Sequence, residues 1–173
     1  MNFLLGAIFV KDLVAYTGSL LLQIAHGLSS SALFLAIGML YDRYKSRNIY
    51  YYRGLVVIMP FFCFFFFLFS LANLAFPGTV NFAAEMLIFF GIFNTAPSIA
   101  ILTLFGILLS AIYSFILLTR IAFGPASLYI RNFYDLTRRE FYTLFPLAFL
   151  IIFLGIFPTY LTAFWTFTLT TWF

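Results

Sequence analysis

Two ionisable side chains, Glu85 and His26, lie within long apolar stretches of the sequence. If those stretches cross a membrane, a carboxylate at the bilayer centre costs about 3 kcal/mol, so the group must face water or a partner, or carry a proton. A histidine titrates near neutral pH and can pass a proton between its two ring nitrogens. The chemistry that these two residues could support is therefore the loading, relay and release of protons.

Each of the two residues also has a structural explanation. Glu85 could form an ion pair, but no lysine of this sequence lies at membrane depth, so its partner would come from another chain. His26 could equally be packed between helices with a hydrogen bond to a serine or a carbonyl. The functional interpretation is the stronger one for Glu85, because intramembrane carboxyl groups usually serve function.

Further polar residues occur at comparable depth, and they could hold a chain of water molecules or bond helices to one another. Ser29 and Ser30 follow His26 by three and four residues and so share its helix face. Asn73 and Asn81 flank a helix-breaking Pro77-Gly78 pair and are suited to cap half-helix ends. The complete supporting set is Ser29, Ser30, Asn73, Thr79, Asn81 and Tyr113.

Other kinds of site are not expected in this chain. Cys63 is the single cysteine, so an intrachain disulfide or a cysteine metal cluster cannot form. His26 is the single histidine, which argues against a metal site. We find no glycine-rich phosphate loop and no serine-nucleophile arrangement, and we expect no catalytic, metal-binding or cofactor-binding residues.

The composition indicates the class of protein in which Glu85 and His26 lie. Hydrophobic residues make up 65% of the 173 residues and charged residues 8%, with a mean hydropathy of +1.10. A soluble domain is about 45–50% apolar and about 25% charged. A soluble enzyme, a nucleic-acid-binding domain and a disordered tail are thereby excluded, and an all-α polytopic membrane protein remains.

We expect a single transmembrane domain over residues 1–173, with about four crossings at 13–41, 54–93, 97–123 and 141–165. The second stretch has 40 residues, and a helix of that length would be about 60 Å long, twice the thickness of the hydrocarbon core. Proline and glycine near its middle break the helix at Pro77-Gly78. The stretch is therefore either two crossings or one broken crossing.

The loop charges favour one broken crossing. In that arrangement the loops at 42–53 and 120–140 lie on one side of the membrane and hold eight of the nine basic residues, which is the asymmetry that orients membrane proteins. With two crossings the basic residues would divide almost evenly. The basic loops could also bind anionic lipid head groups, although setting the topology is explanation enough. The eight residues are Arg43, Lys45, Arg47, Arg53, Arg120, Arg131, Arg138 and Arg139.

Several runs of the sequence resemble the antiporter-like membrane subunits of complex I, the NADH–ubiquinone oxidoreductase, and within them the chain 4 branch rather than chains 2 and 5. They are AHGLSSSALF from Ala25, GMLYDR from Gly38, LANLAFPGTVNFAAE from Leu71, LSAIYS from Leu109 and LTRRE from Leu136. They occur in order over about residues 11–158.

The resemblance implies a fold, a function and a location in the cell. Such subunits have fourteen helices with two inverted five-helix repeats, and this chain is similar to helices eleven to fourteen and the end of helix ten. Glu85 matches the broken-helix carboxylate and His26 the histidine of the preceding helix, which implies that both relay protons. The chain would be a subunit of an H⁺-translocating NADH:ubiquinone reductase of the mitochondrial inner membrane, with loops 42–53 and 120–140 on the matrix side. FMN and iron–sulfur clusters would lie elsewhere in the complex.

The first half of such a subunit, with its own glutamate and central lysines, is absent from this sequence. We therefore expect a split subunit, in which a separate chain carries the N-terminal half and the lysine partner of Glu85, beside other membrane-arm subunits and lipids. Three alternatives stand: a structural scaffold or degenerate remnant, a subunit of a bacterial or chloroplast relative or of a related cation/proton antiporter, and a small channel or carrier that acts alone.

Overall fold

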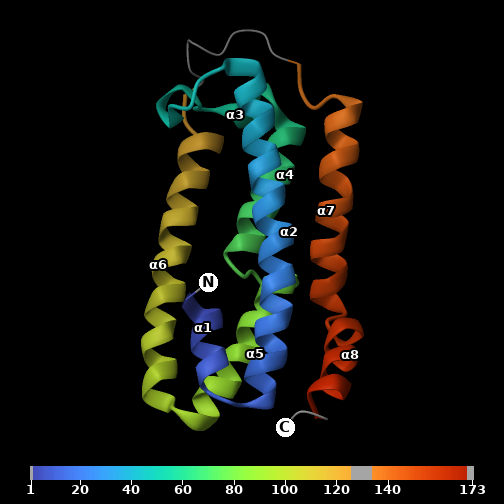
Figure 1. Cartoon of the computed structure of the whole chain (residues 1–173). Helices are drawn as coiled ribbons and strands as arrows, with labels where there is room; N and C mark the ends of the chain where they lie inside the picture. The colour runs from blue at the N-terminus through green and yellow to red at the C-terminus, as the bar shows by residue number, and fades with distance from the viewer. Residues whose placement is uncertain (1, 126–133, 171–173) are drawn as a thin grey trace.

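The computed structural model describes residues 2–125 and 134–170, which form a bundle of α-helices without a strand (Figure 1). The all-α prediction is confirmed over these residues. The helices are α1 (Asn2–Phe9), α2 (Leu13–Tyr44), α3 (Leu55–Ile58), α4 (Pro60–Asn73), α5 (Val80–Thr95), α6 (Pro97–Ala122), α7 (Arg138–Ile156) and α8 (Thr159–Thr170), with a 3-10 turn at Ile49–Tyr51.

Helices α4 and α5 have the arrangement that a broken crossing requires. They have 14 and 16 residues, which correspond to about 21 Å and 24 Å, and each is too short to span about 30 Å of hydrocarbon alone. In Figure 1 they follow one another in the same direction beside α2. Helices α2, α6 and α7 are each long and apolar enough to cross a membrane unaided.

The last expected crossing, 141–165, is divided between two helices. Helix α7 ends at Ile156 and α8 begins at Thr159. Phe157 has φ −119° and ψ 62°, outside the helical region. The cause is Pro158, which has no amide hydrogen and disfavours the helical conformation of the residue before it.

The contact between α2 and α5 depends on small residues. A Cβ atom added to Gly18 of α2 would lie 2.8 Å from the backbone nitrogen of Ile88. A Cβ added to Gly91 of α5 would lie 2.6 Å from the backbone nitrogen of Ala15. Two backbones this close exclude any larger side chain, which is how helices pack within membranes, where van der Waals contact replaces the hydrophobic effect.

The basic end of the bundle, at the top of Figure 1, is held by charged side chains that join segments distant in sequence. Arg43, at the end of α2, forms an ion pair of 2.6 Å with Glu140 of α7. The carboxylate of Asp135 accepts the backbone amides of Phe61 at 2.9 Å and Phe62 at 3.2 Å, so it caps the start of α4. The described parts of loops 42–53 and 120–140 therefore lie at one end, while Arg131 lies outside the described residues.

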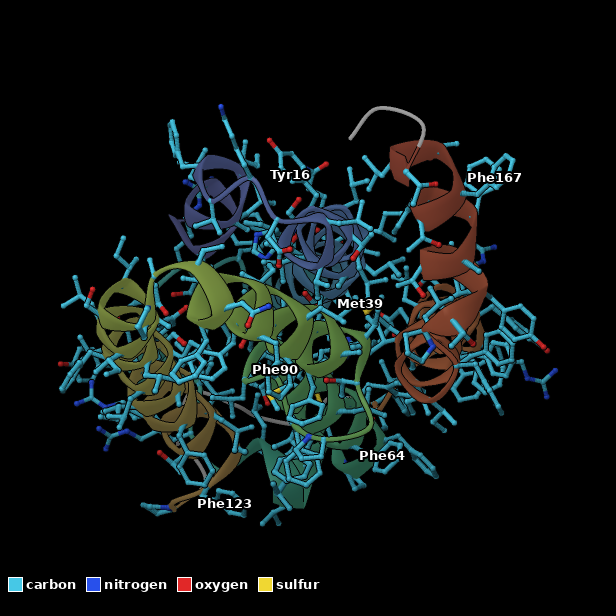
Figure 2. All side chains as sticks on the ribbon, turned by 90° about the horizontal axis from the view of Figure 1, so that it is seen from below. Tyr16, Met39, Phe64, Phe90, Phe123 and Phe167 are labelled. Atoms are coloured by element: carbon cyan, nitrogen blue, oxygen red, sulfur yellow. The ribbon has the colours of Figure 1, made fainter. Side chains whose placement is uncertain are left out.

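The outer surface of the bundle is strongly apolar. Aromatic side chains such as Phe64, Phe90 and Phe167 point away from the helix axes (Figure 2) and are exposed. The Phe61–Phe69 run divides between this surface and the core, because Phe62 and Phe69 are completely buried while Phe61 and Phe64 are exposed. Such a surface requires lipid or other membrane helices around it.

Candidate functional site

The interruption between α4 and α5, residues 74–79, is here called the break. Two of its residues adopt left-handed backbone conformations, Ala75 with φ +54° and Gly78 with φ +96°. Glycine takes this conformation at no steric cost, whereas Ala75 bears some strain. Pro77 cannot donate a backbone hydrogen bond, and the Thr79 hydroxyl donates to the Phe76 carbonyl at 2.8 Å. The break is thus a defined turn within the bundle.

Asn81, in the first turn of α5, connects three segments around the break. Its side-chain nitrogen donates to the Ala72 carbonyl near the end of α4 at 2.8 Å and to the Ser29 hydroxyl of α2 at 3.3 Å. The residue is only 3% exposed. Its oxygen, Oδ1, is buried and accepts no hydrogen bond from the residues that the structure describes. A buried acceptor of this kind calls for a water molecule or another donor.

Helix α7 presses against the break at Gly155. A Cβ atom on Gly155 would lie 2.7 Å from the Thr79 Cα, and it would meet the Gly78 carbonyl oxygen more closely still. The backbone of α7 therefore contacts the backbone of the break directly. This contact fixes the point at which α5 begins, and so the position of the residues on its first two turns.

Glu85 lies on α5 four residues after Asn81 and three before Ile88, and these spacings place all three on neighbouring positions of one helix side. Asn81 contacts Ser29 and Ile88 contacts Gly18, both on α2. The Glu85 side chain is therefore beside the α2–α5 contact, and the residue is partly buried. Among the described residues it forms no ion pair and no hydrogen bond.

His26 occupies the same section of the helix pair from the side of α2. It lies between Gly18 and Ser29, the two α2 residues whose α5 contacts bracket Glu85. Its backbone carbonyl accepts the Ser29 hydroxyl at 3.3 Å, and the residue is partly buried. The described structure shows no hydrogen bond between the His26 and Glu85 side chains, so a transfer between them would need water.

The remaining residues of the expected supporting set divide into two groups. Ser29, Thr79 and Asn81 meet around the break, and Asn73 is the last residue of α4 beside it. Ser30 is turned to its own helix and donates to the Gly27 carbonyl at 3.4 Å. Tyr113 does not join the group: it is exposed on α6 and lines a pocket with arginines at the basic end.

Asp12 was not among the expected site residues. It precedes α2 at the end of the bundle opposite the arginines. Its Oδ2 atom is buried without a hydrogen-bond partner in the described part of the chain. It lies 2.8 Å from the place that a Cβ on Gly91 would take, so it is packed against the backbone of α5. A carboxylate directly after a short apolar segment could have indicated that Asp12 lies at a helix start.

Comparison with known proteins agrees with this arrangement. A family model described as NADH:quinone oxidoreductase/Mrp antiporter, TM matches residues 1–112. NADH-ubiquinone oxidoreductase chain 4 of Chondrus crispus is 46% identical over 159 residues, which are 91% of this chain and 32% of that protein. Chain 4 of Mycosarcoma maydis is 48% identical over 152 residues, covering 87% and 31%. The chain thus spans about a third of the length of the curated relatives it matches.

A solved structure has the same fold. A chain of respiratory complex I from Thermus thermophilus with bound NADH superimposes with a TM-score of 0.83 at 26% sequence identity. The match covers 93% of this chain and 34% of that chain.

Proposed function

Because the chain belongs to the NADH:quinone oxidoreductase/Mrp antiporter transmembrane family, we propose that it is the C-terminal part of a chain 4 subunit of respiratory complex I and conducts protons in the membrane arm. Its place would be the mitochondrial inner membrane, since the curated relatives are eukaryotic chain 4 proteins. Other subunits would oxidise NADH and hold the cofactors. The energy released by that oxidation would drive proton transfer through the membrane arm.

The observation that carries the proposal is the position of Glu85. A carboxyl group lies on a half-helix beside a break, next to a tight contact with a neighbouring helix, and has no ion-pair partner among the described residues. A carboxyl group at this depth needs water, a cation from another segment or a bound proton, and a group that exchanges among these can carry protons. A group that is alternately protonated and deprotonated needs only intermittent access to water.

In the proposed path, Glu85 binds a proton and later releases it, and His26 exchanges protons with it through water. Asn81 Oδ1 supports this path, because a buried acceptor without a donor can hold a water molecule close to the break. A change in the backbone of the break would move α5 and alter the contact of Glu85 with that water. The break is thus the element through which a distant event could act on the carboxyl group.

The proposal includes partners. The rest of the subunit would pack against part of this bundle and bring its lysine near Glu85, beside the other membrane-arm subunits. The apolar outer surface supports such neighbours. Loops 42–53 and 120–140 would face the matrix, in agreement with their excess of arginine and lysine.

The decisive variant is Glu85→Gln, which keeps the shape of the side chain and removes its ability to carry a proton. We expect the assembled complex to lose proton translocation, measured as quenching of a pH-sensitive dye in sealed membrane vesicles energised with NADH. The matched control is Asp42→Asn, which changes an exposed carboxylate at the basic end whose ion-pair partner among the described residues is Lys45, at 3.6 Å. Normal pumping in Glu85→Gln would favour a scaffold role.

Membership of the complex has its own test. Gently solubilised membranes are separated on a native gel, stained for NADH oxidation, and the stained band is sequenced by mass spectrometry. We expect peptides of this chain together with peptides of the remainder of the subunit and of other complex I subunits. Migration away from the NADH-oxidising band would contradict the proposal and favour a carrier or an antiporter of the same family.

A further inference from the structure

A pocket of about 530 Å³ opens at the basic end of the bundle, between the last turns of α6 and the segment that joins α2 to α3. Three arginines line it, Arg47 and Arg53 from the joining segment and Arg120 from α6. Tyr50 and Tyr113 form part of its wall. The remaining wall is mainly apolar, so the pocket combines a cationic rim with an apolar interior.

Within residues 2–125 and 134–170, no carboxylate forms an ion pair with the three guanidinium groups. The described ion pairs at this end are Arg43 with Glu140 and Lys45 with Asp42, and neither uses an arginine of the pocket. The Arg53 guanidinium lies 5.9 Å from the centre of the Tyr50 ring, which orients it without cancelling its charge. The pocket therefore gathers three positive charges around one space with no described carboxylate in its wall.

The pocket continues into an apolar strip along α6. Arg120 lies one turn beyond Ile116, and Ile112, Leu109 and Phe105 follow on the same helix side towards the middle of the bundle. All four apolar residues are exposed. A ligand with an anionic head and a long hydrocarbon tail would fit both the pocket and the strip, with the head among the arginines and the tail along α6.

We propose that this pocket binds the phosphate head group of an anionic phospholipid, whose acyl chains lie along the exposed face of α6. Guanidinium groups bind phosphate through paired hydrogen bonds, and basic pockets between transmembrane helices bind anionic head groups at the membrane surface. The charge count favours an anionic lipid over a zwitterionic one, whose own cation would meet the arginines. The inference is independent of proton transfer by Glu85.

The test uses the native membrane assembly that contains the chain, labelled with a phosphatidylglycerol that carries a photoreactive group on an acyl chain. Cross-linked peptides are mapped by mass spectrometry. We expect labelling of α6 near residues 105–116, stronger than with a phosphatidylcholine probe of the same acyl structure. Unlabelled phosphatidylglycerol should compete, and inorganic phosphate at millimolar concentration should not.

The matched variants are Arg47→Gln/Arg53→Gln/Arg120→Gln and the control Lys45→Gln/Arg138→Gln/Arg139→Gln, which removes the same charge from the same end but leaves the pocket intact. Each pocket arginine should contribute about fivefold in affinity, so labelling should fall by about a hundredfold in the first variant and little in the second. Equal labelling by both probes, equal loss in both variants, absence of α6 labelling, or displacement by inorganic phosphate would each overturn the proposal. Assembly is verified on the native gel, and single Arg→Gln variants replace the triple one if it fails to assemble.

Discussion

Replacing Gly155 with alanine would place a methyl group against the backbone of the break. The added Cβ would lie 2.7 Å from the Thr79 Cα and close to the Gly78 carbonyl, and neither atom belongs to a flexible side chain that could rotate away. Either α7 moves outward or the start of α5 shifts. Overpacking of this kind costs about 1–3 kcal/mol, partly offset by the gain of at most about 1 kcal/mol that alanine brings to a helix.

We therefore expect Gly155→Ala to destabilise the break by about 1–2 kcal/mol, which corresponds to a factor of about 5–30 in local opening. The assay is amide hydrogen exchange of peptides that contain residues 76–81, measured in the assembled protein. The control is Gly27→Ala on α2, where an added Cβ meets no atom within 4 Å. Exchange at the break that is unchanged in Gly155→Ala, or raised equally in Gly27→Ala, would refute the reasoning.

Three further contacts are tested by substitution, each through thermal melting of the assembled protein. Asn81→Leu removes two buried hydrogen bonds and should cost about 1–3 kcal/mol, and an unchanged melting temperature would contradict the bridging role. Arg43→Gln and Glu140→Gln should each lower the stability of the assembled protein. The double variant should lose less stability than the two single losses added together, because the side chains form one ion pair and are only 13% and 20% exposed. Additive losses would argue against an energetic contribution from the pair. Asp135→Asn weakens the cap on α4 and should cost about 1 kcal/mol, whereas a loss as small as that of Asp42→Asn would mean that the cap is unimportant.

The parts of the fold that follow from local chemistry could be predicted from the sequence. The Pro77-Gly78 pair predicted the break, because proline and glycine act on the chain next to them. Loop charge favoured one crossing over two, and α4 and α5 do follow one another in the same direction beside α2. The interruption at Pro158 had the same kind of signal, but the expected crossing of 141–165 ran through it.

Contacts between distant segments could not be predicted. Gly155 contacts the break and Asp135 caps α4 across more than seventy residues of sequence, and neither pairing has a local pattern. Tyr113 was expected only at a comparable membrane depth, and α6 carries it to the arginine pocket, because depth in the sequence does not say which helix face meets which neighbour. The roles of Glu85 and His26 stay predictions, although the structure brings both to one section of the α2–α5 pair.

The central claim is that Glu85 carries protons, and the most direct measurement is the number of protons translocated per NADH oxidised in Glu85→Gln and Glu85→Asp. Both variants alter the same side chain, but only aspartate can bind and release a proton. We predict that this ratio falls in Glu85→Gln and is at least partly restored in Glu85→Asp, with the assembled complex present in both. A ratio that is normal in Glu85→Gln, or equally low in both variants, would contradict it.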